Sequence, residues 1–346
     1  MPLSAKSKEF KLLLVGNPDP VHVGAHLKTA AKELAINCML ADIRNADRGS
    51  ELRRKIHWRL FGHRPTGMRR FNDEVFEACR TFLPNCLIAT GLVPLTQDTL
   101  RRIGQLGIQR GNYLTDDPWN PAHKCRWFLK ALTQYDAVYT PRTENVRDLQ
   151  AHGCRHVSYV PFAYAPRIHY TEDLVEESMD LAFVGGADPD RVPIVSELLK
   201  AGIKVSLYGG YWNRFTATRS SACGMATPEM ARRIASAAKV SLCLVRRANR
   251  DQSCMRTFEL PAMGACIVAE DTEEHRKFYG PDGEIAHYFS NSDQMVQKVK
   301  WLLSNPQIRT RTRANAAAWV ARNAHTYADR LNAMLANVDL AAEAVA

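Results

Sequence analysis

The chain has 346 residues, of which 46% are hydrophobic and 24% charged, and its net charge is +10. This length exceeds what one hydrophobic core supports, so we expect two domains of roughly 150 to 180 residues. The sequence has no uninterrupted apolar run of the ~18 residues that a membrane span needs. The start, MPLSAKSKEF, lacks the apolar core of a secretory signal, and the nine scattered cysteines never form CxxC. We therefore expect a cytoplasmic protein with reduced thiols, no membrane span and no metal.

The net charge is unevenly distributed along the chain. Residues 1–170 hold 25 Lys and Arg against 15 Asp and Glu, whereas residues 171–346 hold 21 of each. A basic first half and a neutral second half indicate an acidic partner for the first half, such as DNA or an anionic glycan. General solubility is an equally good interpretation.

Short apolar runs rich in β-forming residues alternate with amphipathic stretches through the first half, which is the pattern of parallel α/β units. The strands that we expect here are residues 11–15, 37–42, 86–90, 108–114, 136–140 and 156–160.

The loop after the first strand contains Gly16 and Asn17 and leads into a helix. Ligands of such sheets bind beyond the carboxyl ends of the strands, so this loop is a candidate for the acceptor side of a cleft. His22 and His26 are spaced to share one helical face. We name His22 as a candidate acid or base and His26 as an acceptor contact. A metal site is disfavoured because no third ligand accompanies them.

Residues 44–70 contain nine Lys and Arg but only two acids, and aromatic side chains are interleaved among them. An anionic surface, either nucleic acid or glycan, is one interpretation, with Arg59 as an acceptor-side candidate. A solvated amphipathic helix is the simpler one.

The segment TDDPWNP, residues 115–121, follows another expected strand and places Asp116 and Asp117 beside each other. A carboxylate at this place can serve as the base that an acceptor hydroxyl needs. The alternative is that the aspartates cap a helix beginning at Pro118.

A second series of strands follows an irregular connection at 161–179, and it comprises residues 180–184, 204–208, 240–245 and 265–270. We place the domain boundary near Tyr170. The predicted domains are residues 1–170 and 171–325. One long helix is expected from Pro306 through Leu335, and its part within 326–346 packs back on the first domain.

Glycines end the first two strands of this second series. Gly185 and Gly186 let a backbone approach a phosphate, and Arg191 supplies positive charge nearby. Tyr211, after the next glycine pair, is a candidate for stacking on a base, or else for packing. The segment has neither GxGxxG nor GxxxxGK[ST], which disfavours a dehydrogenase or a P-loop enzyme.

The strongest local pattern is DQSCMRTFELPAMGACIVAED, residues 251–271. Arg256 and Thr257 fall near a helix N-terminus, where free N–H groups and the helix dipole favour an anion such as a diphosphate. Glu259 is placed to accept hydrogen bonds from ribose hydroxyls. The simpler interpretation is that Glu259 complements the dipole and Arg256 is a solvated charge.

Residues 256–264 read RTFELPAMG, and this segment resembles the R-T-F-E-x-P-A-x-G signature of the CgeB-like family, named for a spore maturation protein. Residues 180–212 resemble the opening of that family's donor domain, and the acidic stretch at Asp116 and Asp117 has a counterpart there. The resemblance extends over nearly the whole chain. In the wider superfamily a spaced acidic pair frames the donor, and Asp251 with Glu259 has that spacing, although Asp replaces the usual Glu.

The resemblance implies an α/β protein of the GT-B fold, in which two Rossmann-like αβα domains face a central cleft. It implies a metal-independent glycosyltransferase that needs no cofactor, with the nucleotide-sugar donor held mainly by the second domain and the acceptor by the first. A polysaccharide, a lipid, a protein or DNA with a modified base all remain acceptors to be considered. Two other interpretations also remain open: a non-catalytic nucleic-acid-binding protein with a GT-B shell, and a sugar-nucleotide epimerase.

Overall fold

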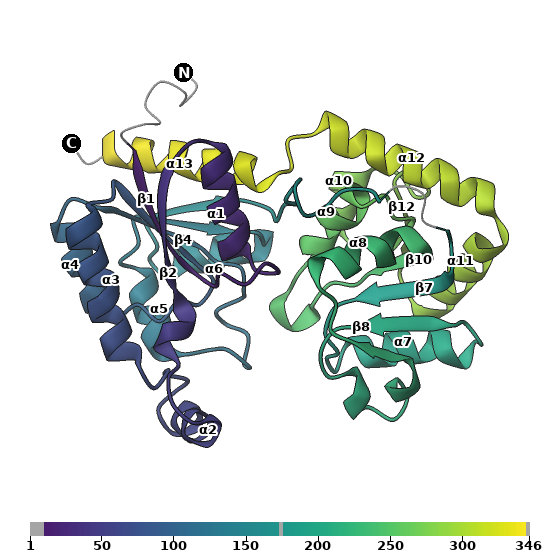
Figure 1. Ribbon diagram of the computed structural model, residues 1–346, viewed down its shortest axis with the longest axis horizontal. Coiled ribbons are helices and arrows are strands. Elements are labelled where there is room, and N and C mark those ends of the chain that lie inside the picture. Colours follow the sequence, from purple (N-terminus) through teal and green to yellow (C-terminus); the bar gives the residue numbers. More distant parts are fainter. Residues whose placement is uncertain (1–9, 173–175, 344–346) are drawn as a thin grey trace. The chain divides into compact units, whose positions relative to one another are not determined.

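The computed structural model describes residues 10–172 and 176–343 (Figure 1). The chain forms two compact units, residues 1–161 together with 327–346, and residues 162–326. The division falls between Pro161 and Phe162, so all of the connection expected at residues 161–179 except Pro161 belongs to the second unit. Residues 173–175 of that connection, and the last three residues of the chain, lie outside the described residues.

The first unit contains one six-stranded parallel sheet in the order β2-β1-β3-β4-β5-β6. Strand β1 lies between β2 and β3, and its residues Leu12, Leu13, Leu14 and Val15 are all fully buried because both faces of the sheet are covered. The strands are β1 (Lys11–Gly16), β2 (Asn37–Asp42), β3 (Cys86–Thr90), β4 (Gln109–Tyr113), β5 (Ala137–Thr140) and β6 (His156–Tyr159).

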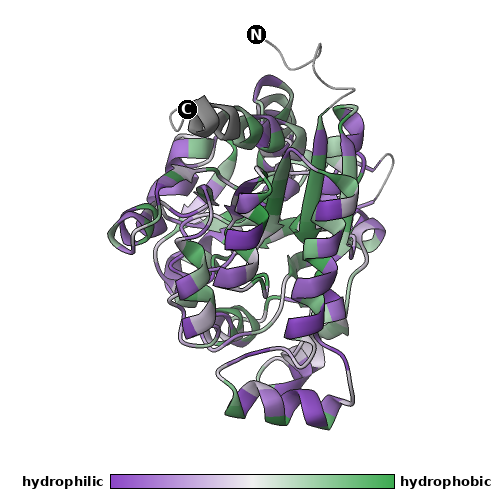
Figure 2. Ribbon diagram, turned by 90° about the vertical axis from the view of Figure 1, so that its left-hand side faces the viewer, coloured by the Kyte–Doolittle hydropathy of each residue, from purple (hydrophilic) through white to green (hydrophobic). Residues whose placement is uncertain are grey.

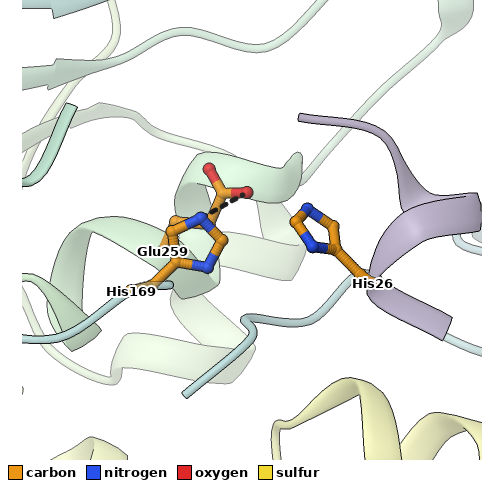
Figure 3. A group of neighbouring side chains, drawn as sticks. All are labelled: His26, His169 and Glu259. Carbon is orange, nitrogen blue, oxygen red and sulfur yellow. Dashed lines mark ion pairs between the residues drawn. The ribbon is translucent and has the colours of Figure 1, made fainter. Parts of the chain in front are cut away.

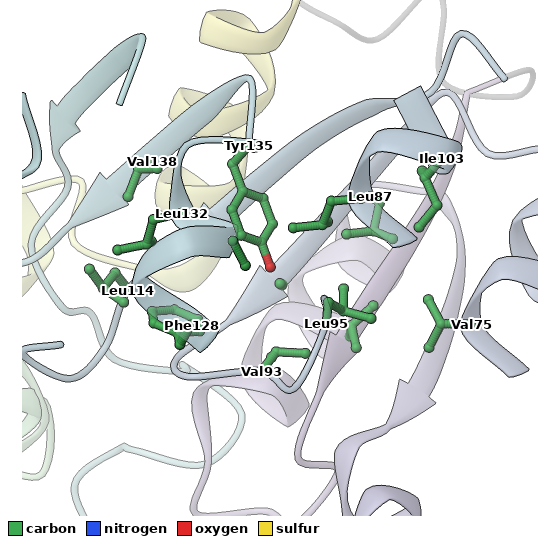
Figure 4. Close-up of a cluster of buried hydrophobic side chains, with 14 of the residues drawn as sticks. Val75, Leu87, Val93, Leu95, Ile103, Leu114, Phe128, Leu132, Tyr135 and Val138 are labelled. Atoms are coloured by element: carbon green, nitrogen blue, oxygen red, sulfur yellow. The ribbon is translucent and has the colours of Figure 1, made fainter. Parts of the chain in front are cut away.

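Helices cover both faces of this sheet. One face carries the apolar cluster shown in Figure 4, to which α3 (Met68–Phe82), α4 (Gln97–Gln105), α5 (Arg126–Leu132) and α6 (Thr143–Ala151) contribute. On the other face α1 (Val23–Glu33) contacts α13 (Tyr327–Glu343), and the hydroxyl of Tyr139 donates to the Met334 carbonyl at 2.7 Å. The short η2 (Ile43–Ala46) and α2 (Glu51–Leu60) lie between β2 and α3.

The second unit is built on a second six-stranded parallel sheet in the order β12-β11-β10-β7-β8-β9. The strands are β7 (Met179–Val184), β8 (Val205–Tyr208), β9 (Ala222–Gly224), β10 (Ala238–Cys243), β11 (Ile267–Glu270) and β12 (Ala286–Phe289). The order of strands reverses at β7, because β8 and β9 follow on one side of it and β10, β11 and β12 follow on the other. A ligand is expected at such a reversal, beyond the carboxyl ends of the strands.

Two helices, α7 (Arg191–Lys200) and α11 (Ser292–Ser304), pack on one face of the second sheet with its main apolar core. The other helices of this unit are α8 (Pro228–Ala237), α9 (Met255–Ala262), α10 (Glu273–Tyr279) and α12 (Pro306–Arg322). Short turns η3 (Trp212–Arg214), η4 (Arg219–Ser221) and η5 (Arg247–Asn249) complete it.

All the expected strands are present, but the sequence analysis missed β9 and β12. The single helix expected over residues 306–335 is wrong, because α12 ends at Arg322 and α13 begins at Tyr327. The Asn323 amide donates to the Trp319 carbonyl at 2.7 Å, and the His325 ring packs 4.7 Å from that of Trp319. Thr326 forms a parallel bridge with Tyr164. These tertiary contacts hold the four residues in an extended form.

No helix in the part of the chain that the structure describes is long and apolar enough to cross a membrane.

Candidate functional site

The glycine turns that end β7 and β8 lie against each other in the second unit. The Gly185 N–H donates to the Tyr208 carbonyl at 2.7 Å, and the Ala187 N–H donates to the Gly210 carbonyl at 2.9 Å. Gly209 has a φ of +131°, and a Cβ there would lie 2.3 Å from the Gly185 carbonyl oxygen, so glycine is required. Gly185 and Gly186 thus stand at the carboxyl end of β7, as predicted.

Arg191 is buried and connects the ends of two strands. Its guanidinium donates to the carbonyls of Gly186, at 3.2 Å, and Leu244, at 3.1 Å. Its Nε lies 3.4 Å from Oδ2 of Asp188, and Oδ1 of the same carboxylate accepts from the Arg191 N–H at 2.8 Å, just before α7. The arginine expected to supply charge to a phosphate therefore holds the Gly186 turn in place.

The first turn of α9 is fixed by Thr257, which is fully buried. Its hydroxyl accepts from the Cys254 N–H at 3.0 Å and lies 3.0 Å from Nε2 of His275. His275 Nδ1 lies 2.7 Å from the Glu270 carbonyl, and this ring nitrogen is the donor there because a carbonyl only accepts. Nε2 then accepts from Thr257. Both hydrogen-bond partners of the Thr257 hydroxyl are thus groups of the protein itself, and Thr257 is a positioning residue.

Burial lowers the pKa of His275 from 6.5 to about 4. The unfolded chain therefore takes up a proton at this ring below about pH 6.5, and the folded chain only near pH 4. This contribution to stability is complete above pH 6.5 and is lost as the pH falls toward 4. With 1.36 kcal/mol per pKa unit, the loss is at most about 3 kcal/mol.

We predict that His275→Gln reduces the loss of thermal stability between pH 7 and pH 5, measured as Tm. Glutamine keeps an amide that donates to the Glu270 carbonyl and accepts from Thr257, but it does not titrate. Burial also lowers the pKa of His287 to about 4. The contribution of His287 to the pH dependence of Tm is the same in the wild type and in His275→Gln. His156→Gln, at an exposed position, is the control for loss of a histidine. An unchanged pH dependence of Tm in His275→Gln would contradict the assignment.

Arg256 and Glu259 form an ion pair within α9, one turn apart. The Arg256 Nε donates to the Val184 carbonyl at 3.0 Å, so this guanidinium reaches the end of β7 immediately before the Gly185 turn. The side chain of Arg256 is 27% exposed, whereas that of Glu259 is 1% exposed. A partly exposed cation is thereby fixed between the N-terminal half of α9 and the turn at Gly185 and Gly186.

His169 is the second partner of Glu259, and the sequence analysis did not identify it (Figure 3). Its Nδ1 accepts from the Ala165 N–H at 3.0 Å, which leaves the proton on Nε2. Nε2 lies 3.5 Å from Oε1 of Glu259. His169 and Arg256 therefore approach the same buried carboxylate and orient it. No spacing rule relates His169 to Glu259, because the contact joins segments far apart in the sequence.

Tyr211 lies at the carboxyl end of β8, in a strained and exposed position. Tyr211 has a φ of 74°, is 56% exposed, and stacks under the Arg214 guanidinium at 4.2 Å from its ring centroid. A left-handed backbone at a bulky residue is a strained conformation. The exposed ring at the carboxyl end of β8 is available for stacking with a planar ligand.

Asp251 lines an acidic cavity of about 900 Å³ at the carboxyl ends of β10, β11 and β12. Neither Arg256 nor Glu259 lines this cavity. Glu270, also missed by the sequence analysis, is 6% exposed and accepts from the Val245 N–H at 2.7 Å and from Arg247 at 2.9 Å. The charged side chains around the cavity include Asp190, Arg247, Asp251, Glu270, Asp271 and Asp293.

In the first unit, Gly16 and Asn17 end β1 where it meets the first turn of α1. A Cβ on Gly16 would lie 2.3 Å from the Thr90 hydroxyl oxygen, and one on Gly24 would lie 2.7 Å from the Asn17 carbonyl. The glycines are thus needed for close packing. The Asn17 side chain accepts from the Asp19 N–H at 3.0 Å and shapes the same turn.

The two histidines near this turn lie in different surroundings. His22 is exposed and precedes α1 as its N-cap residue, without a side-chain capping bond. His26 is 1% exposed and stacks on the Tyr327 ring of α13, with ring centroids 4.9 Å apart. Of the pair, His22 is the one whose ring solvent reaches.

The loop after β4 contains both candidate aspartates. Asp117 is 1% exposed, and its Oδ1 accepts from the Trp119 N–H at 3.0 Å and the Asn145 amide at 3.1 Å. Asp116 is half-buried, and the Thr115 hydroxyl donates to it at 3.4 Å. Arg142, which is 2% exposed and was not identified from the sequence, donates to the carbonyls of Leu114 and Thr115. Asp117 and Arg142 therefore shape the loop that presents Asp116.

Comparison with known proteins gives a family match and a fold match. Residues 191–336 match a family model described as Glycosyl transferase-like. A search of curated proteins by sequence finds no match.

Three solved structures are similar to the chain over almost their whole length. A sucrose-phosphate synthase from Thermosynechococcus elongatus has 11% identity and a TM-score of 0.68, with 97% of this chain and 100% of that chain covered. HepE from Anabaena, solved with UDP-glucose, has 11% identity and a TM-score of 0.63, with 95% and 100% covered. A glycosyltransferase from Rickettsia africae has 9% identity and a TM-score of 0.61, with 96% and 98% covered. At these identities the likeness shows a shared fold.

Proposed function

We propose that this chain, which has the GT-B fold, is a glycosyltransferase that moves a sugar from a nucleotide-sugar donor to an acceptor hydroxyl. The donor is proposed to bind in the second unit, at the carboxyl ends of β7 and β8 and the first turn of α9. The similar Anabaena structure was solved with UDP-glucose, which makes a UDP-sugar the first donor to test here. The RTFELPAMG signature supports placement of the chain in the CgeB-like family within this class.

The observation that carries the proposal is the buried carboxylate of Glu259, held between Arg256 and His169. Placing a carboxylate in a buried position is unfavourable unless partners compensate it, so two partners indicate a carboxylate kept ionised and oriented. An ionised carboxylate accepts hydrogen bonds from two neighbouring hydroxyls, such as those of a ribose. We propose that Glu259 binds the ribose of the donor.

The leaving group of such a transfer is a nucleoside diphosphate, and its negative charge grows in the transition state. The Arg256 guanidinium reaches the end of β7, next to the Gly185 and Gly186 turn. Fixed positive groups aimed at developing charge are among the largest contributions to catalysis. We propose that Arg256 and the N–H groups at the start of α9 stabilise the diphosphate, with no metal ion required, and that Tyr211 stacks on the base.

The acceptor hydroxyl must lose a proton, and we propose Asp116 as the base, with Asp117 positioning its loop. Asp116→Asn is predicted to lower the rate of transfer by about 100-fold or more while donor binding stays unchanged. Asp117→Asn is predicted to lower Tm more than Asp116→Asn, because its carboxylate is buried and bonded within the loop. Transfer rates and Tm of both variants check this.

Asp98→Asn, at an exposed ion pair on α4, is the matched control for loss of a carboxylate. Full transfer activity in Asp116→Asn would remove this residue as the base and direct attention to His22.

The basic first unit supports an anionic acceptor, either DNA carrying a modified base or a charged polysaccharide. A DNA acceptor predicts that its binding weakens steeply with salt, in proportion to the phosphates contacted. The salt dependence of KM for each acceptor, at fixed donor, distinguishes the two.

The reaction class itself is tested by product analysis after incubation with UDP-, GDP-, dTDP- and CMP-sugars. A glycosyltransferase releases the nucleotide and lengthens the acceptor by one sugar. An altered sugar still attached to its nucleotide would instead indicate an epimerase and overturn the proposal.

A further inference from the structure

We propose that α2 is an interfacial helix that docks the protein on an anionic lipid surface. The proposal concerns the first unit alone and does not depend on the identity of the donor or acceptor. It begins from an unusual feature of this helix: none of its residues, Glu51 to Leu60, is buried.

The helix carries a stripe of large aliphatic side chains that face solvent. Leu52, Ile56 and Leu60 are 69%, 49% and 72% exposed, and they recur every fourth residue. At 100° per residue these positions follow one side of the helix. A stripe of this kind normally faces a core, so its exposure indicates a surface meant to be covered by something else.

Positive charge surrounds the stripe. On the helical wheel Arg53 lies beside one edge of it and Arg59 beside the other, and residues 44–70 hold nine Lys and Arg against two acids. In Figure 2 the lowest helix of the view is α2, where hydrophilic and hydrophobic residues alternate. An apolar stripe flanked by basic residues is the pattern of helices that lie in the plane of an anionic membrane surface.

Hydrogen bonds fix the start of the helix and the loops on either side of it. The Ser50 side chain accepts from the Arg53 N–H at 3.4 Å at its start, and the Gly67 N–H donates to the Ala46 carbonyl at 2.8 Å where the segment returns. The Trp127 indole donates to the Gly62 carbonyl at 3.2 Å. The stripe is therefore presented in a preformed helix, which lowers the ordering entropy lost on docking.

The contacts of the aromatic rings in and beside α2 argue against nucleic acid as its partner. Single-stranded nucleic acid is bound by aromatic faces on which bases stack, and here a histidine already covers one face of each ring. Phe61 lies 4.5 Å from His57, and Trp58 lies 4.8 Å from His63, between ring centroids. Exposed Leu and Ile add nothing to phosphate binding, whereas they insert among lipid acyl chains.

The test is co-sedimentation of the full-length protein with vesicles of phosphatidylcholine, with and without phosphatidylserine. We expect binding to the vesicles that contain phosphatidylserine, and weaker binding as salt rises. The variant L52S/I56S/L60S should lower the vesicle partition coefficient by about tenfold or more. The variant R53Q/R59Q should lower it by about 25-fold, since each basic residue near the surface contributes about fivefold.

Leu106→Ser, at an exposed leucine after α4, is the matched control and should bind like the wild type. Because the stripe is exposed, all variants should keep the wild-type Tm, which confirms that they are folded. The proposal is overturned if the wild type does not bind vesicles containing phosphatidylserine, or if L52S/I56S/L60S binds them as well as the wild type. It is also overturned if the full-length protein binds duplex DNA in preference to vesicles and only R53Q/R59Q reduces the binding to DNA.

Discussion

Replacing Glu259 by Gln is expected to lower kcat/KM for the nucleotide-sugar donor by about 10- to 100-fold. The carboxylate is 1% exposed and oriented by Arg256 and His169, so its hydrogen bonds to a ribose would be charge-assisted and shielded from water. Gln keeps the shape and one acceptor oxygen but loses the charge. Because the ribose is bound equally in the ground state and the transition state, the loss should appear mainly in KM.

Steady-state kinetics with varied donor, together with the donor Kd, measure this effect. Glu229→Gln, at an exposed ion pair on α8, removes a carboxylate of the same unit and should leave both constants unchanged. A Glu259→Gln enzyme with the wild-type KM and Kd for donor would show that the carboxylate does not bind it.

The second large effect is expected at Arg256, where Arg256→Met should lower kcat by about 100- to 1,000-fold. The guanidinium is fixed at the end of β7 by its bond to Val184, and the charge of a departing diphosphate grows as the glycosidic bond breaks. An interaction that strengthens in the transition state acts on kcat more than on KM. Arg256 and Glu259 should therefore differ in which constant they change.

Removing the arginine also leaves Glu259 without its cation, which lowers Tm. Arg256→Lys keeps a positive charge but cannot donate to Val184 and Glu259 in the same geometry, so it separates the two effects. For Arg256→Lys we expect a Tm near that of the wild type and a kcat lowered by about tenfold or more. Arg233→Gln, at an exposed ion pair on α8, is the control. Wild-type kcat in both Arg256 variants would be incompatible with a role in leaving-group stabilisation.

The two substitutions should not be additive, because the side chains contact each other. Double variants of contacting residues commonly differ from the sum of the single variants by 0.5 to about 3 kcal/mol. Arg256→Met combined with Glu259→Gln also removes the buried unpaired charge, so its Tm should exceed that of Arg256→Met alone.

Most of the fold was predictable because the strands of a parallel sheet are buried on both faces and read as short apolar runs. Residues 11–15 and 86–90 are such runs, and each became a strand. The strand β12 was missed because Ala286–Phe289 includes a histidine, which reads as polar although His287 is 3% exposed and lies 3.2 Å from the Thr312 hydroxyl. The three residues of β9 are too few for any periodicity.

The break between α12 and α13 lacks the residues that most often interrupt a helix. Residues 323–326 contain neither Pro nor Gly, and the chain leaves the helix because His325 packs against Trp319 and Phe258 and Thr326 pairs with Tyr164. Contacts between distant segments of this kind override helix propensity.

The candidate site shows the same limit. The signature at 256–264 located Arg256 and Glu259 on a short helix, and the glycines located the turn after β7. The sequence did not separate residues that face a ligand from those that hold the site together. Thr257 and Arg191 are buried and bonded to backbone or buried side chains, and only their tertiary partners reveal this. His169, far from Glu259 in the sequence, was missed for the same reason.

The most direct test of the central claim is isothermal titration calorimetry of the reaction products UDP, GDP, dTDP and CMP with the wild type, Glu259→Gln and Arg256→Lys. We predict that one nucleotide binds the wild type, that both variants bind it more weakly, and that Glu229→Gln binds it like the wild type. If no nucleotide binds, or if binding is the same in all four proteins, the donor site is not at α9.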